Sequence, residues 1–257
     1  MTKIKTENIL PFFKGVLASY SQVFFSRNKL FGILLFLVTF IHPYAGMAGL
    51  LAVITSLATA WLIGYDKKLT EQGIYGFNSL LTALCMGIFF EPSPLLLLLI
   101  AITSVFVVFL TVAMQGILYK YNLPFLSIPF LISVWIVILA TRNFNALSLS
   151  PRTIFFLNEL YKLGGNQLVR LYEMSDKIPI PGSVKIYLES LGAIFFQYNL
   201  LAGAIIAIGL FFFSRIAFSL SLLGFYSAWI FYKLIGADIS SLGYSYIGFN
   251  YILTAIA

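Results

Sequence analysis

The chain has 257 residues, of which 60% are hydrophobic and 10% are charged, and its mean hydropathy is +0.96. A water-soluble core of this size cannot bury so much apolar surface, so the composition excludes a soluble globular protein and predicts a protein embedded in a lipid bilayer. The net charge is +7. Because Lys and Arg are spread over short connections and form no block, no nucleic acid partner is expected.

The first element expected along the chain is a half-helix at 10–26. Lys14 and several serines interrupt this segment, and it is too short for a lipid-facing span, which takes about 20 apolar residues. It predicts either a tilted or re-entrant half-helix or an amphipathic helix that lies flat on the bilayer. A segment at 185–197 has the same character, and this repetition favours the re-entrant interpretation.

Long apolar runs predict the membrane helices. They lie at 30–42, 44–64, 77–90, 94–119, 123–141, 200–214, 216–235 and 246–257. Several runs are shorter than a full span or are cut by prolines, and backbone that leaves the helix at membrane depth must be buried in protein or line a water-filled cavity. A polar connection at 142–186 divides the runs, and a short helix near 153–175 within it is expected to act as a lid or as a tether.

Two stretches about 170 residues apart carry nearly the same sequence. SQVFFSRNKLFG (21–32) resembles GAIFFQYNLLAG (192–203), and YGFNSLLTALCMG (75–87) resembles IGFNYILTAIA (247–257). The duplication predicts a first transmembrane repeat at 10–141, the polar connection at 142–186 and a second repeat at 187–257. The second repeat stops directly after its GFN element, so it is expected to be incomplete.

The expected fold class is therefore an all-α integral membrane protein with two repeats. Each repeat would have about five membrane helices and a re-entrant half-helix, and an odd number of crossings would invert the second repeat relative to the first. Duplicated halves with broken apolar segments are typical of a transport pathway at a repeat interface. Lys3, Lys5 and Lys14 favour a cytoplasmic N-terminus, although the connection also carries positive charge.

The absences in the sequence favour passive movement of a neutral solute. No acidic cluster for ion coupling lies inside an apolar run. With His42 as the sole histidine and Cys85 as the sole cysteine, neither a metal site nor a disulfide is expected. No catalytic arrangement or phosphate loop occurs, so neither an enzyme nor a cofactor is expected.

Several residues in the duplicated segments could contact such a solute. The Gln22 amide could donate hydrogen bonds to the solute and accept them from it, or it could form a hydrogen bond to another helix. The paired aromatic residues Phe25, Phe196, Phe77 and Phe249 could sandwich a flat molecule or simply pack. The GFN elements could form a narrow apolar constriction or a tight helix turn that Asn78 caps. Ser127, between two prolines in LPFLSIPFLI, could add an oxygen to a polar patch or satisfy a freed backbone group.

The ordered motifs QVFF with N-x3-G, GFN-x2-LT and LPxLSxPF resemble the urea transporter family. The resemblance implies a homotrimer in the inner (plasma) membrane whose protomers have ten membrane helices and a pore each. Urea would move passively down its gradient through a slot with aromatic walls and a lining of oxygens. Matching the family motifs position by position gives the pore residues Gln22, Val23, Phe25, Phe77, Leu81, Ser127, Ile194, Phe249 and Leu253.

The chain departs from the family pattern at one mouth of the expected pore. Ala193 stands where a Gln or Glu matching Gln22 is expected, and we expect Glu189, one helical turn earlier on the same face, to compensate. The alternatives are a channel for another small neutral polar solute, such as a short amide or ammonia, and a non-conducting membrane remnant.

Overall fold

The computed structural model describes residues 9–142, 147–150, 161, 164–167, 169–170, 173–174, 179–237 and 248–257. Within them the chain is helical apart from turns and one isolated antiparallel bridge between Phe90 and Leu149. The chain forms two compact units, Met1–Leu149 and Ser150–Ala257, which we describe one at a time. The boundary proposed from the duplication, at 142–186, remains a prediction.

The helices of the first unit follow the apolar runs closely. They are α1 (Ile9–Gln22), α2 (Lys29–Thr39), α3 (Pro43–Ile63), α4 (Lys67–Glu71), α5 (Phe77–Phe89), α6 (Pro94–Tyr119) and α7 (Ile128–Thr141). Prolines and caps set several boundaries: α3 and α6 begin with proline, and the Ser93 hydroxyl accepts from the Leu96 N–H. Gly64, left-handed with φ +85°, ends α3.

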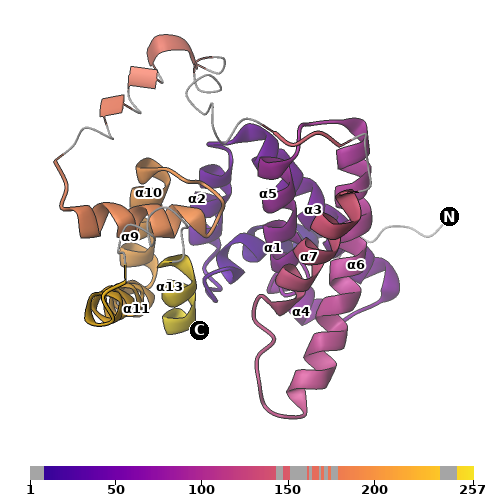
Figure 1. Ribbon diagram of the computed structural model, residues 1–257. Coiled ribbons are helices and arrows are strands. Elements are labelled where there is room, and N and C mark those ends of the chain that lie inside the picture. The colour runs from indigo at the N-terminus through magenta and orange to yellow at the C-terminus, as the bar shows by residue number, and fades with distance from the viewer. Residues whose placement is uncertain are drawn as a thin grey trace. The chain divides into compact units, whose positions relative to one another are not determined.

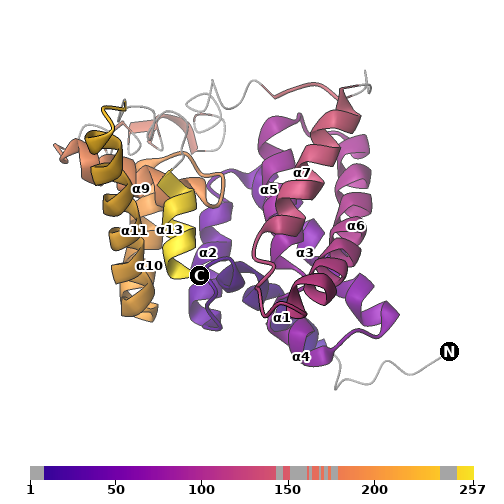
Figure 2. The same ribbon diagram turned by 60° about the horizontal axis from the view of Figure 1, so that its bottom comes forward.

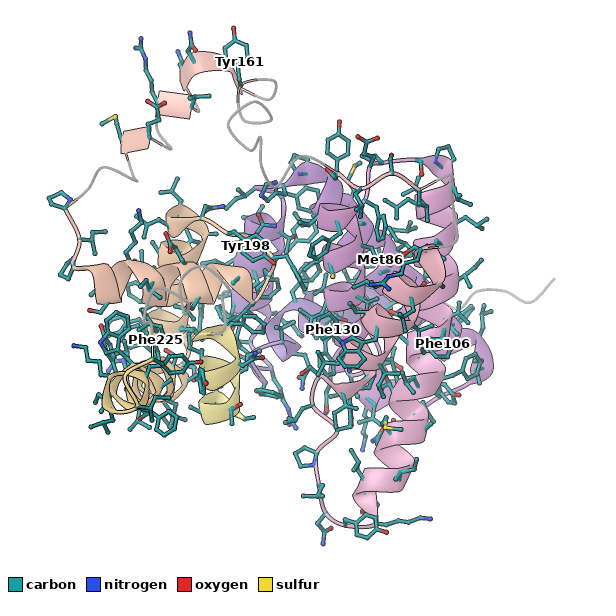
Figure 3. The ribbon with its side chains drawn as sticks, viewed as in Figure 1. Met86, Phe106, Phe130, Tyr161, Tyr198 and Phe225 are labelled. Carbon is teal, nitrogen blue, oxygen red and sulfur yellow. The ribbon has the colours of Figure 1, made fainter. Side chains whose placement is uncertain are left out.

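Helices α3, α5, α6 and α7 pack together and run side by side in Figure 2. Their core includes Met86 of α5, Ile100 of α6 and Val137 of α7, and α5 is buried from Phe77 to Ile88. In contrast, α6 exposes a row of apolar side chains, including Phe106, which lies on its outer flank in Figure 3. A helix with one face in a protein core and an exposed apolar face fits a lipid environment.

The second unit contains the described helices α9 (Gly182–Ala193), α10 (Leu200–Phe213), α11 (Arg215–Leu234) and α13 (Gly248–Ile256), labelled in Figure 1. Helix α10 packs on α9 and α11, and α13 packs on α9 and α11. Phe225, fully buried on α11, lies against the Tyr187 ring of α9, with 5.4 Å between ring centroids.

Helix lengths fall into two classes. α3, α6 and α11, with 21, 26 and 20 residues, are long and apolar enough to cross a membrane, whereas α2, α5, α7 and α10 have 11 to 14 residues. At 1.5 Å per residue, α5 extends about 20 Å, less than the hydrocarbon thickness of about 30 Å. The chain is thus an all-α, multi-pass membrane protein whose described residues combine three helices long enough to cross a membrane with several shorter apolar helices.

Two differences from the sequence-based elements stand out, and one expected element is not tested. The run at 123–141 becomes helical only at Ile128, because Pro124 and Pro129 and a left-handed Leu126 (φ +45°) break its first turn. The short α4, which follows the Asp66 cap, was not expected. The helix expected near 153–175 falls largely outside the described residues.

Candidate functional site: two matching half-helix ends

The end of α1 is a tight turn that places Phe25 in a left-handed conformation. After Gln22 the chain makes a hydrogen bond from the Phe25 N–H to the Gln22 carbonyl (2.9 Å) and one from the Ser26 N–H to the Ser21 carbonyl (3.1 Å). This pair of bonds is the Schellman motif, whose left-handed position usually holds glycine. Phe25 holds it here, with φ +54°, at a cost of about 1–2 kcal/mol for a residue with a Cβ.

The end of α9 repeats this turn bond for bond. The Phe196 N–H donates to the Ala193 carbonyl (2.9 Å), the Gln197 N–H donates to the Gly192 carbonyl (3.0 Å), and Phe196 has φ +57°. Phe25 and Phe196 are two of the four non-glycine residues with positive φ in the described part of the chain. Each strained Phe is half-buried, whereas its neighbour, Phe24 or Phe195, is buried.

The turn leads into a capped helix in both units. The Asn28 side chain accepts from the Leu30 N–H (2.9 Å) at the start of α2, and Asn199 accepts from the Ala202 N–H (2.7 Å) at the start of α10. An asparagine at the N-cap satisfies helix-end donors that would otherwise stay unpaired. The turn and the following cap connect α1 to α2 and α9 to α10, and the two helices of each pair pack against each other.

Glycines let these paired helices approach closely. A Cβ at Gly32 of α2 would overlap the Leu17 carbonyl oxygen of α1, and a Cβ at Gly203 of α10 would overlap the Leu188 carbonyl oxygen of α9. The GFN glycines follow the same rule: a Cβ at Gly76 would overlap the Ser19 hydroxyl. In the second unit, a Cβ at Gly248 would overlap the Ser190 hydroxyl in the same way. In each unit, α1 or α9 thus packs closely against the helix that follows it and against the GFN helix.

In the first unit, the GFN helix α5 supplies two of the predicted pore residues. Phe77 and Leu81 are 4% and 5% exposed and lie one turn apart. The Phe77 ring lies beside the Phe125 ring, with centroids 6.0 Å apart and planes at 35°. Phe125 belongs to the proline-broken segment before α7, so the structure brings Phe77 close to the segment that carries Ser127.

Ser127 is the N-cap residue of α7, yet its side chain makes no capping hydrogen bond. It is half-buried, and no described group hydrogen-bonds to its hydroxyl. The interpretation that Ser127 satisfies a freed backbone group is therefore wrong. The hydroxyl keeps its donor and acceptor capacity for another molecule.

Asn78 performs the task that Ser127 does not. Its amide group donates to the Leu126 carbonyl (3.3 Å), and its carbonyl oxygen accepts from the Phe130 N–H (3.3 Å). The N-cap of α5 is Gly76, without a side-chain cap, so the interpretation that Asn78 only caps its own helix is also wrong. One turn later, the Thr82 hydroxyl lies 2.8 Å from the Ser133 hydroxyl of α7.

The remaining predicted residues lie at the ends of α1, α9 and α13. Gln22 is the last residue of α1 and is half-buried, while Val23 and Ile194 are buried at equivalent positions in the two turns. Ala193, which ends α9, is buried, and Glu189 lies one turn earlier and is half-buried. Phe249 and Leu253 lie one turn apart on α13, both half-buried.

Sequence reasoning missed three contributors: the interhelical role of Asn78, the Phe125 ring, and the contacts of Ser19 and Ser190 with the GFN glycines. Ser19 and Ser190 are separated by the same 171 positions as Phe25 and Phe196, so extending the alignment of the repeats towards the N-terminus would have found them. No sequence signal distinguishes an Asn that caps its own helix from one that bonds to another helix.

The structure is that of a multi-pass membrane protein with several short helices that have polar residues at their ends. Among the described residues, no three potential metal-ligating side chains lie together. Residues 13–257 match the family described as "Urea transporter". The chain belongs to the urea transporter family, which is a family of transport proteins and not of enzymes.

Two curated relatives are similar to about half of the chain. Urea transporter 1 of sheep (Ovis aries) is 28% identical over 140 residues, which cover 53% of this chain and 36% of the sheep protein. Urea transporter 1 of mouse (Mus musculus) is 26% identical over 141 residues, which cover 53% of this chain and 37% of the mouse protein. The alignment thus spans little more than a third of each relative.

Proposed function

We propose that the chain conducts urea passively down its concentration gradient, as a homotrimer in the inner (plasma) membrane. The observation that carries this proposal is the strained turn that occurs twice, at Phe25 and at Phe196, in a member of the urea transporter family. Left-handed backbone at a bulky residue is costly and clusters where function needs a side chain held in one place.

The solute-contacting residues in this proposal are those expected from the sequence. They are Gln22, Val23, Phe25, Phe77, Leu81, Ser127, Ile194, Phe249 and Leu253. Urea is flat and uncharged, so aromatic rings can stack on its faces while oxygens accept from its N–H groups and replace lost water. The unengaged hydroxyl of Ser127 near the paired Phe77 and Phe125 rings supports this assignment in the first unit.

Stopped-flow light scattering on proteoliposomes tests the proposal. We expect urea permeability above that of empty liposomes, and a reduction when Phe25 or Phe196 is replaced by alanine. Urea permeability equal to that of empty liposomes, with the protein correctly folded, would indicate a non-conducting chain.

A second candidate function is the passage of another small neutral solute, such as acetamide or ammonia. The observation that favours it is Ala193, a small buried residue at the position equivalent to Gln22, which removes one amide from the mouth. If acetamide or ammonia permeated well and urea did not, this second function would replace the first.

We further propose that Glu189, half-buried one turn before Ala193, supplies the missing polar contact for urea. Glu189→Ala should lower urea permeability, and Glu189→Gln, which keeps a carbonyl acceptor, should retain more of it. Unchanged urea permeability in Glu189→Ala would rule out this role.

A further inference from the structure

At the start of α7, the capping hydrogen bond is made by Asn78 of α5 and not by the N-cap residue Ser127. In an ordinary helix, the N-cap serine accepts a hydrogen bond from the N–H two or three residues later. For Ser127 the first of these positions is Pro129, which has no N–H, and the second is Phe130. The Phe130 N–H instead donates to the Asn78 carbonyl oxygen of α5.

Asn78 also forms a hydrogen bond on the other side of Ser127, before the start of α7. Its amide group donates to the carbonyl of Leu126, the residue that adopts a left-handed conformation just before Ser127. The Asn78 side chain is fully buried, whereas Leu126 and Phe130 are half-buried, so both hydrogen bonds are partly shielded from water. One side chain thus satisfies the backbone groups that flank Ser127, and the Ser127 hydroxyl is left uncommitted.

We propose that Asn78 is a positioning residue that caps α7 from the neighbouring helix and thereby releases the Ser127 hydroxyl for the solute. This inference rests on the proposed function in one respect, namely that the solute contacts Ser127. Its structural half is independent: without Asn78, the Ser127 hydroxyl should turn back and cap the Phe130 N–H itself.

A double-substitution cycle on thermal stability tests the structural half without any transport measurement. In the wild-type background, Ser127→Ala should leave the melting temperature unchanged. In the Asn78→Leu background, Ser127→Ala should remove a newly formed N-cap and lower the melting temperature by about 2–4 °C. An equal effect of Ser127→Ala in both backgrounds would overturn the proposal.

Asn78→Asp provides a second background in case Asn78→Leu does not fold. A carboxyl group at this position still accepts from the Phe130 N–H, so Ser127→Ala should remain without effect on the melting temperature there. Thr82→Val is the matched control, because it removes an α5–α7 hydrogen bond without touching the break at Ser127. A further fall with Ser127→Ala in the Asn78→Asp background would contradict the capping role.

Urea permeability of the same variants tests the other part of the proposal, namely that the solute contacts the Ser127 hydroxyl. Ser127→Ala and Asn78→Leu should each lower urea permeability about fivefold, the factor that corresponds to one hydrogen bond. The double variant should be no worse than either single variant, since both remove the same hydroxyl contact. Multiplied effects, about 25-fold, would show that Asn78 acts independently of Ser127. Wild-type protein without urea permeability would refute the proposed function, while the stability cycle would still decide the role of Asn78.

Discussion

At the scale of single residues, the two left-handed phenylalanines are a costly backbone choice in the proposed site. Glycine fits this position without penalty, yet Phe25 and Phe196 both occupy it. We therefore expect the bulky side chain to serve a role that glycine cannot fill. The repetition in the sequence identified these residues. A sequence motif does not specify backbone φ angles, so the strain is seen only in the structure.

Substitutions of Phe25 should have different effects on stability and on urea transport. Phe25→Gly relieves the left-handed strain, worth about 1–2 kcal/mol, and so should hold or raise the melting temperature, although the half-buried ring loses its contacts. Phe25→Ala keeps the strain and loses the same ring, so it should be less stable than Phe25→Gly. Urea permeability, measured on proteoliposomes, should fall in both.

The same pair of substitutions at Phe196 serves as the replicate in the second unit. If Phe25→Ala matched the wild-type protein in urea permeability, the ring would have no part in conduction.

The glycines of the paired helices offer a second test at this scale. Gly32→Ala and Gly203→Ala place a methyl group onto a backbone carbonyl of the neighbouring helix. Overpacking of this kind costs about 1–3 kcal/mol, so each variant should melt at a lower temperature. Gly116 in α6 is the matched control, because a Cβ there meets no atom within 4 Å; Gly116→Ala should be neutral or slightly stabilising. Equal effects at all three glycines would contradict close helix packing.

At the scale of elements, hydrophobic patterning predicted most of the described helices to within a few residues. Two kinds of element escaped it. The five residues of α4 are mostly polar and carry no periodic signal, and the break before α7 depends on hydrogen bonds from Asn78 to Leu126 and Phe130. Apolar runs indicate which segments are buried in lipid or protein. They do not indicate where a side chain from another helix takes the place of a backbone hydrogen bond.

The asparagine caps allow a test of the repeated helix pair. Asn28→Ala and Asn199→Ala should each cost about 1 kcal/mol, because the N-terminal N–H groups of α2 and α10 lose their acceptor. Asn28→Ser and Asn199→Ser keep a capping oxygen and should recover most of the melting temperature. Differential scanning fluorimetry in detergent would measure these shifts, and alanine variants as stable as the serine variants would argue against capping.

At the scale of the whole molecule, composition alone predicted the membrane class, and the ordered motifs predicted the family. The duplicated segments fold into the same local structure in both units, as the turns at Phe25 and Phe196 show. The limits of each repeat and the passage that the proposed residues line together remain predictions, because motifs identify residues without fixing how larger parts assemble.

Transport by this chain should be independent of ion gradients. Helices α3, α5, α6, α7, α10 and α13 contain no Asp, Glu, Lys or Arg, so they offer no charged site for a coupled proton or sodium ion. Glu189 of α9 is the one carboxylate that we propose to contact the solute, and a single carboxylate at one mouth is not an acidic cluster for ion coupling. Urea permeability should therefore be the same when a proton or sodium gradient is applied across the proteoliposome and when it is dissipated by an ionophore. A change of severalfold with either gradient would indicate coupling.

The length of α6 has a consequence for the surrounding bilayer. Its 26 residues extend about 39 Å, roughly 9 Å more than the hydrocarbon layer. The excess is accommodated by tilting, by locally thickening the lipid, or by letting the exposed Tyr119 and Tyr121 reach the headgroups, where tyrosine is favoured. Lipids with longer acyl chains should therefore suit this protein better than short-chain lipids.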